Sequence, residues 1–267
     1  MKMKPEFSSI QPVHKLDSFN LRTLPTQGPV PKELILQNKL SDIDESFLIL
    51  GQQFSQLKKD QQSSLLLILQ GMDASGKDSA IRVLLKGLRV NNLRVEAFRE
   101  PSHEEQQHDF LWRVHQKSPA KGEMVIFNRS HYEDVLVARV RGGIDNNVVE
   151  SRFRHIVNFE SLLIDHQVII LKCFLHISKD EQRLRLQDRL DDPSKHGKLN
   201  RADFQDRERW DDYMQAYGDA LKRTSSEDAP WYVIPSDNKV ERDRSLKKIL
   251  ISRLMNHQAP EAPFNAA

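Results

Sequence analysis

Short apolar runs alternate with longer amphipathic stretches through most of the chain. The runs have the length of buried strands, and the stretches between them repeat their apolar positions at helical spacing. The expected strands are 64–69, 93–98, 124–127, 168–177 and 231–234, and the expected helices are 41–60, 78–90, 102–118, 147–166, 178–190, 203–223 and 240–256. This alternation predicts an α/β fold with a parallel sheet covered by helices on both faces. Such sheets bind ligands at the carboxyl ends of their strands, so polar residues that follow a strand are the candidates for chemistry.

The two ends of the chain differ from this alternating region. Residues 1–40 are polar and hold five of the 12 prolines. We therefore expect an extended N-terminal arm that packs over the domain or over a partner subunit. Residues 41–257 are expected to form one domain, and residues 258–267 a C-terminal tail.

The composition narrows the class of protein. The 267 residues carry 40 basic and 38 acidic side chains, a formal net charge of +2, which does not favour nucleic-acid binding. The N-terminus lacks the apolar core of a secretory signal, and no stretch approaches the roughly 20 apolar residues that span a bilayer. The single cysteine, Cys173, lies in an apolar run and fits a buried thiol in a reducing compartment. We expect a cytoplasmic protein with no nucleic-acid or membrane partner.

The first expected strand ends in a glycine-framed turn, GMDASGKDS at 71–79. Gly71 and Gly76 let the backbone turn sharply and approach an anion closely. The N–H groups of such a loop and of the helix that follows cradle phosphate, and Lys77 adds a positive charge beside the outer phosphates. The phosphate-binding residues expected here are Gly71, Ala74, Ser75, Gly76, Lys77, Asp78 and Ser79.

Two acidic residues set this turn apart from most phosphate loops. Asp78 stands where most of them carry the Ser or Thr that holds magnesium, and Asp73 lies inside the loop. A carboxylate among phosphate-facing amides would repel the ligand unless a cation lay between them, so Asp73 predicts bound Mg²⁺. The alternative is that Asp73 bonds to its own backbone, as Asp often does in turns.

Polar side chains also follow the second and third expected strands. Arg129 can hold a phosphate oxyanion with its fork of donors, and Arg99 is expected at the same edge of the sheet. Further along, Glu133 and Asp134 could supply a second magnesium ligand. The alternative for Asp134 is a structural one, in which it caps a helix or pairs with Arg139.

The fourth expected strand leads into a basic segment with the features of a mobile lid. Ser178 and Glu181 form a capping box that starts a helix. That helix carries Arg183, Arg185 and Arg189, and a polar loop with Lys195, His196 and Lys198 follows. A lid of this kind, expected at about 183–209, would fold over bound phosphates and exclude water. The alternative is a basic helix balanced by its own acidic residues.

Taken together, these segments resemble the polyphosphate kinase 2 family over roughly residues 30–250. The combination is far more specific than a lone phosphate loop. The segments that carry the resemblance are GMDASGKDS at 71–79, FREPSHEE at 98–105, HDFLWRVH at 108–115, FNRSHYEDVLV at 127–137, FLHISKDEQRLRLQDRLDDPSKH at 174–196, WDDYMQAY at 210–217 and WYVIPSDNK at 231–239.

The resemblance implies a three-layer α/β/α phosphate-loop kinase core with a helical lid. It also implies reversible, Mg²⁺-dependent transfer of a phosphoryl group between inorganic polyphosphate and a nucleotide. Asp73 would orient the metal and the acceptor phosphate, Lys77 would clamp phosphate, and Arg189 would be a lid arginine over the transferring group. Arg129 would be the second-motif arginine, and Asp134 the acidic partner of magnesium. Arg99, Arg185, Lys195 and Lys198 would hold the rest of the phosphate chain.

The acceptor and the assembly also follow from the resemblance. The segments HDFLWR and NRSHYEDV look like the class III subgroup, which is associated with both AMP and ADP as acceptors; guanine nucleotides are an alternative to adenine ones. A homodimer or homotetramer is implied as well.

The chain departs from the family pattern at a few positions. Many members carry Asp where this chain has Asn128, which is why the metal role is assigned to Asp134. Gly197 and Leu199 stand where the subgroup commonly has aromatic residues, and VERDR replaces a more usual aromatic continuation after Lys239.

Two other functions compete with this interpretation. An ATP-dependent nucleoside monophosphate kinase would share the phosphate loop and the arginine-bearing lid, but a loop acid such as Asp73 is unusual there. A non-catalytic nucleotide-binding module would keep Gly71, Gly76 and Lys77 without needing the acidic residues and the lid. Nucleotide binding without turnover would favour the module.

Overall fold

Five parallel strands form one sheet in the order β2–β3–β1–β4–β5. This computed structural model describes residues 10–28, 49–52, 55, 63–88, 92–198 and 200–256. The strands are β1 (Ser64–Gln70), β2 (Leu93–Ala97), β3 (Met124–Asn128), β4 (Val168–His176) and β5 (Trp231–Pro235). Every residue of β1 and β4 is buried, as expected for central strands covered on both faces. All five lie where the apolar runs predict strands, so the predicted α/β fold is confirmed.

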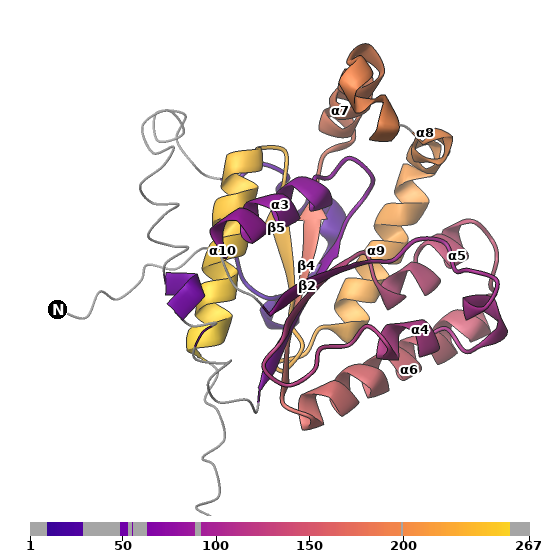
Figure 1. Cartoon of the computed structure of the whole chain (residues 1–267). Coiled ribbons are helices and arrows are strands. Elements are labelled where there is room, and N and C mark those ends of the chain that lie inside the picture. The colour runs from indigo at the N-terminus through magenta and orange to yellow at the C-terminus, as the bar shows by residue number, and fades with distance from the viewer. Residues whose placement is uncertain are drawn as a thin grey trace, which may run out of the picture.

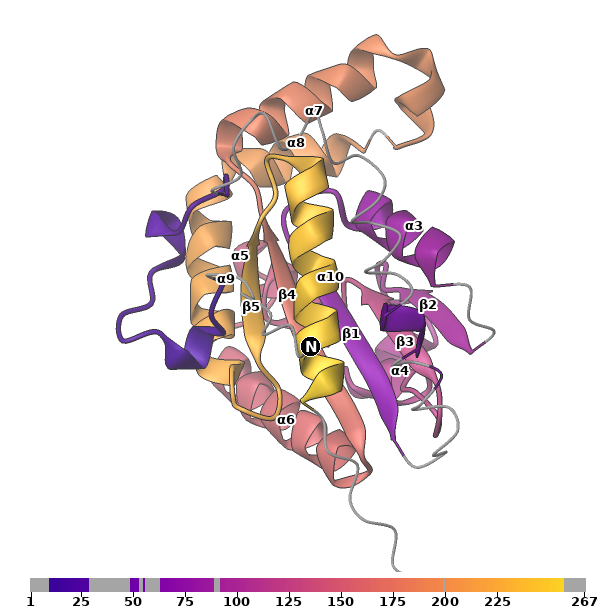
Figure 2. The same cartoon turned by 90° about the vertical axis from the view of Figure 1, so that its left-hand side faces the viewer.

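Helices cover both faces of this sheet (Figure 1, Figure 2). One layer contains α3 (Lys77–Gly87) and α10 (Lys239–Met255), and the other contains α6 (Asn146–Asp165) and α9 (Trp210–Thr224). Alternate side chains of β1 divide between the two cores: Leu65 packs with the α3–α10 layer and Leu66 with the α6–α9 layer. The three-layer core predicted by the resemblance is present.

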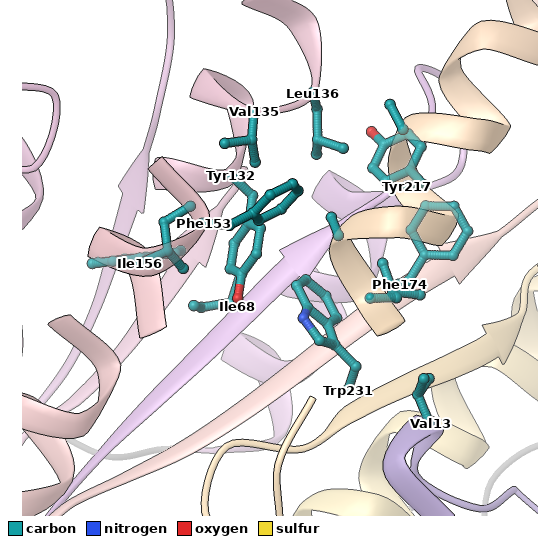
Figure 3. Close-up of a cluster of buried hydrophobic side chains, with 14 of the residues drawn as sticks. Val13, Ile68, Tyr132, Val135, Leu136, Phe153, Ile156, Phe174, Tyr217 and Trp231 are labelled. Atoms are coloured by element: carbon teal, nitrogen blue, oxygen red, sulfur yellow. The ribbon is translucent and has the colours of Figure 1, made fainter. Parts of the chain in front are cut away.

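The core on the α6–α9 side fixes the turn that follows β3. Tyr132 lies in that turn and is fully buried against Phe153 and Trp231 (Figure 3). Its hydroxyl donates a 2.8 Å hydrogen bond to Glu160 Oε1, and Glu160 forms a buried ion pair with Lys172. Tyr132, Glu160 and Lys172 are bonded to one another in this buried network, and such bonding favours one arrangement. The polar residues around Tyr132 are therefore held in a fixed position at the end of β3.

The described part of the N-terminal arm packs onto the domain. Residues 10–28 contain the short 3-10 helices η1 (Val13–Lys15) and η2 (Leu21–Thr23), and Val13 and Leu21 are buried in the α6–α9 core. Most of the helix predicted at 41–60 lies outside the described residues; residues 49–52 and 55 are helical. No helix among the described residues is long and apolar enough to cross a membrane.

Two predicted helices are interrupted in the structure. The stretch 102–118 holds only η3 (Glu105–Gln107) and α4 (Trp112–His115), because the Asp109 side chain accepts a hydrogen bond from Leu111 N and starts a new turn. The stretch 203–223 belongs to α8 (Arg201–Glu208) and α9, which are separated at Arg209. Shorter elements missed by the periodicity are η4 (His131–Asp134) and α5 (Val137–Val140).

Candidate functional site

The phosphate loop connects β1 to α3 at the carboxyl edge of the sheet. Gly71 has a φ of +150° and Gly76 a φ of +101°, and Ala74 also has a positive φ of 63°. A Cβ at Gly71 would lie only 2.7 Å from the carbonyl oxygen of Leu175, so both the backbone conformation and the space require glycine there. The loop therefore has the tight form that the sequence predicts.

Lys77 begins α3 and folds back over the loop. Its buried Nζ donates hydrogen bonds of 2.6 Å to Gly71 O and 3.2 Å to Met72 O. Burial lowers the pKa of Lys77, and the positive charge of Arg129 lowers it further. The ammonium group thus lies inside the loop, where an anion would gain most from it.

The remaining predicted loop residues differ in their surroundings. Ser75 is fully buried, and its hydroxyl has no hydrogen-bond partner within the described residues. Ser79 Oγ donates to Gly76 O over 2.9 Å, and the exposed Asp78 accepts a 2.7 Å hydrogen bond from the Asn128 amide. Asn128 at the end of β3 is therefore bound to the first turn of α3.

Asp73, Arg129 and Glu133 form a charged row beside the loop. Arg129 Nη2 pairs with Asp73, and its Nη1 lies 3.7 Å from Glu133 Oε2. Burial alone would raise the pKa of Asp73, but the charges of Arg129 and Lys77 outweigh it, so that pKa is lowered. For Glu133 burial dominates over the same two cations, and its pKa is raised. The Asp73 carboxylate thus pairs with Arg129, outside the loop. This contact does not favour the alternative in which Asp73 bonds only to its own backbone.

A small cavity opens between this charged row and α9. Its lining residues are Gly71, Met72, Asp73, Arg129, Glu133, Val137, Asp206, Tyr213 and Tyr217. The Tyr213 hydroxyl donates to Asp206 Oδ1 over 2.8 Å, and Arg141 Nη2 donates to Asp206 Oδ2 over 2.9 Å. Asp206, Tyr213 and Tyr217 were not among the site residues predicted from the sequence. The spacing of the two tyrosines, four residues apart at the start of a helix, could have indicated them.

Asp134 lies outside the lining of this cavity. Its carboxylate oxygens are each 3.8 Å from an arginine, Oδ2 from Arg113 and Oδ1 from Arg152, and Arg152 Nη1 also donates to Asp134 O over 2.7 Å. Arg139, the partner considered from the sequence, pairs instead with Asp219 over 2.7 Å. The structure therefore brings Glu133, and not Asp134, to Asp73 and Arg129.

The predicted lid consists of α7 (Lys179–Asp191), η5 (Pro193–Lys198) and α8, and it projects beyond the carboxyl edge of the sheet (Figure 1). Arg189 Nη1 and Asp203 Oδ2 pair across it at 3.0 Å. Burial, followed by the charge of Asp73, raises the pKa of Asp203 to about 6. Asp203 and Arg189 thus belong to the same electrostatic cluster as the phosphate loop.

The tip of the lid carries the predicted lysines. Lys195 Nζ lies 2.9 Å from Asp188 and 3.0 Å from Asp192, on the exposed side of the lid. Lys198 ends η5, and Leu199 lies outside the described residues. Lys195 is therefore not among the residues that meet at the cavity.

Arg185 is fully hydrogen-bonded within the protein. Each of its five N–H donors has a hydrogen-bond partner at 2.7 to 3.2 Å within the protein. The acceptors are Glu181 Oε1, Ala74 O, Ser75 O, Ser236 O and Asp237 O. A guanidinium has five such donors and no more, so all the donors of Arg185 are used within the protein in this conformation. Its phosphate contact stays a prediction. Arg185 ties the lid base to the phosphate loop and to the connection after β5.

The start of α7 is fixed in the same way. Ser178 Oγ accepts a 3.1 Å hydrogen bond from Glu181 N, which confirms the predicted N-cap. The reciprocal bond of a capping box is absent here, because Glu181 turns to Arg185 and Asp237 accepts the Ser178 N–H instead. Gln182 Nε2 also donates to Asp73 O over 3.0 Å. The base of the lid is therefore bonded to the phosphate loop.

Arg99 follows β2, as predicted, but is remote from these contacts. Its backbone carbonyl accepts a 2.9 Å hydrogen bond from Arg113. Its exposed side chain makes no hydrogen bond or ion pair with any residue that the structure describes.

The sequence and the fold of this chain are similar to those of known proteins. The model of the polyphosphate kinase 2 family matches residues 37–262. An AMP/ADP-polyphosphate phosphotransferase of Meiothermus ruber is 47% identical over 225 residues, 81% of this chain and 84% of the relative. An ADP-polyphosphate phosphotransferase of Rhodopseudomonas palustris is 43% identical over 72% of this chain and 70% of the relative. A crystal structure of polyphosphate kinase 2 from Arthrobacter aurescens superimposes with a TM-score of 0.84 at 37% identity, covering 95% of this chain and 92% of that one.

Proposed function

Because the chain belongs to the polyphosphate kinase 2 family, we propose that it transfers a phosphoryl group from inorganic polyphosphate to AMP and to ADP. An oxygen of the acceptor's terminal phosphate forms the new P–O bond, and the bond to the next phosphate of the donor breaks. ADP or ATP leaves, and the polyphosphate is one unit shorter. The observation that carries the proposal is the acidic residue inside the phosphate loop, Asp73, paired with Arg129 from the neighbouring strand end.

Lys77 and the loop amides would hold the phosphates that react. Phosphoryl transfer depends mainly on alignment and on neutralising the charge of a loose transition state. Lys77 is buried and fixed by two loop carbonyls, so it needs little reorganisation when a phosphate arrives. The first turn of α3 adds the positive end of a helix at the same place.

Arg129 and Arg189 would supply the further positive charge that two polyanionic substrates require. Each arginine is paired with a carboxylate here, Arg129 with Asp73 and Arg189 with Asp203. A phosphate oxygen is an equally good acceptor for a guanidinium fork and can take over such a bond when it enters the site. Arg189 lies on the lid, so this exchange would couple substrate binding to the lid position.

The acidic residues of the cavity fit a magnesium ion. Mg²⁺ is usually held by one or two carboxylates together with substrate phosphates and water. Asp73 and Glu133 both line the cavity, while no group of three or more metal-ligating side chains occurs among the described residues. Asp73 and Glu133 would therefore hold the ion, which would supply positive charge to neutralise the phosphates when bound. Asp134 would act on this pair only indirectly, through its neighbours Arg113 and Arg152.

The acceptor nucleotide would bind on the α9 side of the loop. Val137, Tyr213 and Tyr217 give the cavity an apolar and aromatic wall, which suits a nucleoside. The opposite side of the loop would then be left for the donor. Homodimer or homotetramer assembly stays a prediction, which the mass of the purified protein in solution would test.

The proposal is tested by separating nucleotides after incubation with Mg²⁺ and one donor at a time. We expect long-chain polyphosphate to convert AMP to ADP, and ADP to ATP, with both products absent in Lys77→Ala. Turnover of AMP with ATP alone would instead support a nucleoside monophosphate kinase. Nucleotide binding without any product would support a non-catalytic module.

A further inference from the structure

The guanidinium of Arg242 lies against the phosphate loop, from the side opposite to the cavity. Arg242 is in the first turn of α10, which shares one layer with α3 (Figure 1, Figure 2). A Cβ at Gly76 would lie 2.0 Å from Arg242 Nη1 and 3.2 Å from its Cζ. The arginine therefore occupies the space that the glycine leaves open, directly before α3 begins.

Arg242 Nη1 is a buried donor without a partner. The residue is 1% exposed, and Nη1 makes no hydrogen bond within the described part of the chain. Its Nε and Nη2 both donate to Asp243 Oδ1, at 2.8 and 2.6 Å. Leaving a charged donor buried and unpaired is costly, so such a group calls for a partner, such as a ligand, an ion or a water molecule. Asp243 fixes the guanidinium so that Nη1 is the end turned towards the loop.

The surroundings of Arg242 favour an anion. Burial lowers the pKa of Arg242 more than Asp243 raises it, and the nearby charge of Arg185 lowers it further. Ser75, in the same loop, has a second buried and unpartnered polar atom, its hydroxyl oxygen. The start of α3 also faces this place. The positive charge of Arg242 thus lies at Gly76, and the Ser75 hydroxyl is a further unused hydrogen-bonding group of the same loop, near Gly71.

This placement is built into the fold. Arg185 donates to Ala74 O and Ser75 O in the loop, and also to Ser236 O and Asp237 O in the connection between β5 and α10. Those bonds draw the start of α10 to the phosphate loop. Asn238 caps α10 by accepting from Val240 N and Glu241 N, which sets the first turn.

We infer that Arg242 is a ligand of the donor, binding the polyphosphate unit next to the one held by Lys77. The inference rests on the proposed function and adds the side from which the donor enters. Tyr213 and Tyr217 form the wall for a nucleoside on the α9 side, whereas Arg242 offers guanidinium donors on the α10 side. A chain of phosphates that crosses the loop towards α10 has no base to stack and needs such donors at each unit.

The test compares Arg242→Gln and Arg242→Lys with Arg253→Gln. Arg253 is on the same helix, about 16 Å further along at 1.5 Å per residue. Within the described part of the chain its Nη1 and Nη2 donate to Glu227 O and Asp228 O, and its buried Nε has no partner, but it does not lie at the phosphate loop. Inorganic tripolyphosphate is the probe, in calorimetric binding without nucleotide and in initial-rate kinetics with AMP. For Arg242→Gln we expect Kd and KM for tripolyphosphate to rise tenfold or more, with KM for AMP within twofold of wild type. For Arg242→Lys, Kd and KM for tripolyphosphate should lie between those of wild type and Arg242→Gln. For Arg253→Gln they should match wild type.

Several outcomes would overturn the inference. A lower Tm with unchanged tripolyphosphate affinity would make Arg242 a packing residue only, and an equal rise in both KM values would mean a general distortion of the site. A rise confined to long-chain polyphosphate would place Arg242 further from the reacting unit. If Arg242→Gln does not fold, Asp243→Asn keeps the arginine but frees its orientation and should weaken tripolyphosphate binding severalfold; unchanged binding would contradict the inference.

The proposed function can fail separately from this inference. If wild-type protein transfers no phosphate from polyphosphate, but tripolyphosphate still binds and Arg242→Gln weakens that binding, only the proposed function is wrong. If wild type transfers phosphate and the Arg242 variants bind tripolyphosphate normally, only the inference is wrong.

Discussion

Replacing Arg185 by methionine tests whether this arginine anchors the phosphate loop or binds phosphate directly. Methionine keeps an apolar stem but removes five hydrogen bonds, four of them to backbone carbonyls of the phosphate loop and of the connection after β5. Each intramolecular hydrogen bond contributes about 1 kcal/mol net to stability. The side chain is only 10% exposed, so water replaces few of these bonds. We expect a loss of about 3–5 kcal/mol in the free energy of unfolding.

Scanning calorimetry measures this loss directly. A change of 1 kcal/mol shifts Tm by roughly 2–4 °C in a chain of about this size, so Arg185→Met should lower Tm by on the order of 10 °C. Arg185→Lys retains three donors and should lose about half as much. Arg183→Met is the matched control, because Arg183 is exposed on the same helix and surface substitutions usually change stability by less than about 0.5 kcal/mol.

Kinetics with the same variants complete the test. Because Arg185 holds the phosphate loop in place, Arg185→Met should also raise KM for polyphosphate and for AMP together. If Arg185→Met keeps the wild-type Tm and raises KM for polyphosphate alone, Arg185 does not anchor the phosphate loop. Arg185 would then be a phosphate ligand, as the sequence suggested.

Three further predictions concern the charged groups of the site. Lys77→Ala should abolish turnover and leave the far-ultraviolet circular dichroism spectrum unchanged; retained activity would remove the loop lysine from the mechanism. Glu133→Gln should raise the Mg²⁺ concentration needed for half-maximal rate at least tenfold, and Asp134→Asn should raise it much less; the reverse order would return the metal role to Asp134. Because burial raises the folded-state pKa of Asp203 to about 6 from 3.8, its contribution to stability is greatest below pH 3.8 and is lost as pH rises through 6. Asp203→Asn should therefore gain stability relative to wild type on going from pH 5 to pH 8, by about 1.4 kcal/mol, which is seen as a rise in its relative Tm. A constant difference across that range would contradict the raised pKa of Asp203.

The strands and the phosphate loop could be predicted because their signals are local. The apolar run predicts the buried strand β1, and Gly71, Gly76 and Lys77 after it predict the turn that follows. Helix ends were less predictable, since the break before α4 depends on one side-chain bond from Asp109. Periodicity does not register a competing bond of this kind.

The roles of the arginines could not be predicted from the sequence. Arg185 and Arg189 were both predicted to bind phosphate and Arg242 was not, but the partners of such residues lie as far as 111 residues away along the chain. Only the fold shows that Arg185 has no free donor whereas Arg242 has one. The choice between Glu133 and Asp134 has the same origin, because neighbouring residues in a tight turn point to different partners.

We propose above all that a phosphoryl group passes directly from polyphosphate to a nucleotide at the loop that contains Lys77. The most direct measurement incubates the protein with ³²P-labelled long-chain polyphosphate, Mg²⁺ and unlabelled AMP, and follows the label. We expect label in the terminal phosphate of ADP and then in ATP, and no labelled nucleotide with Lys77→Ala. Label released as orthophosphate, or nucleotide products that remain unlabelled, would contradict it.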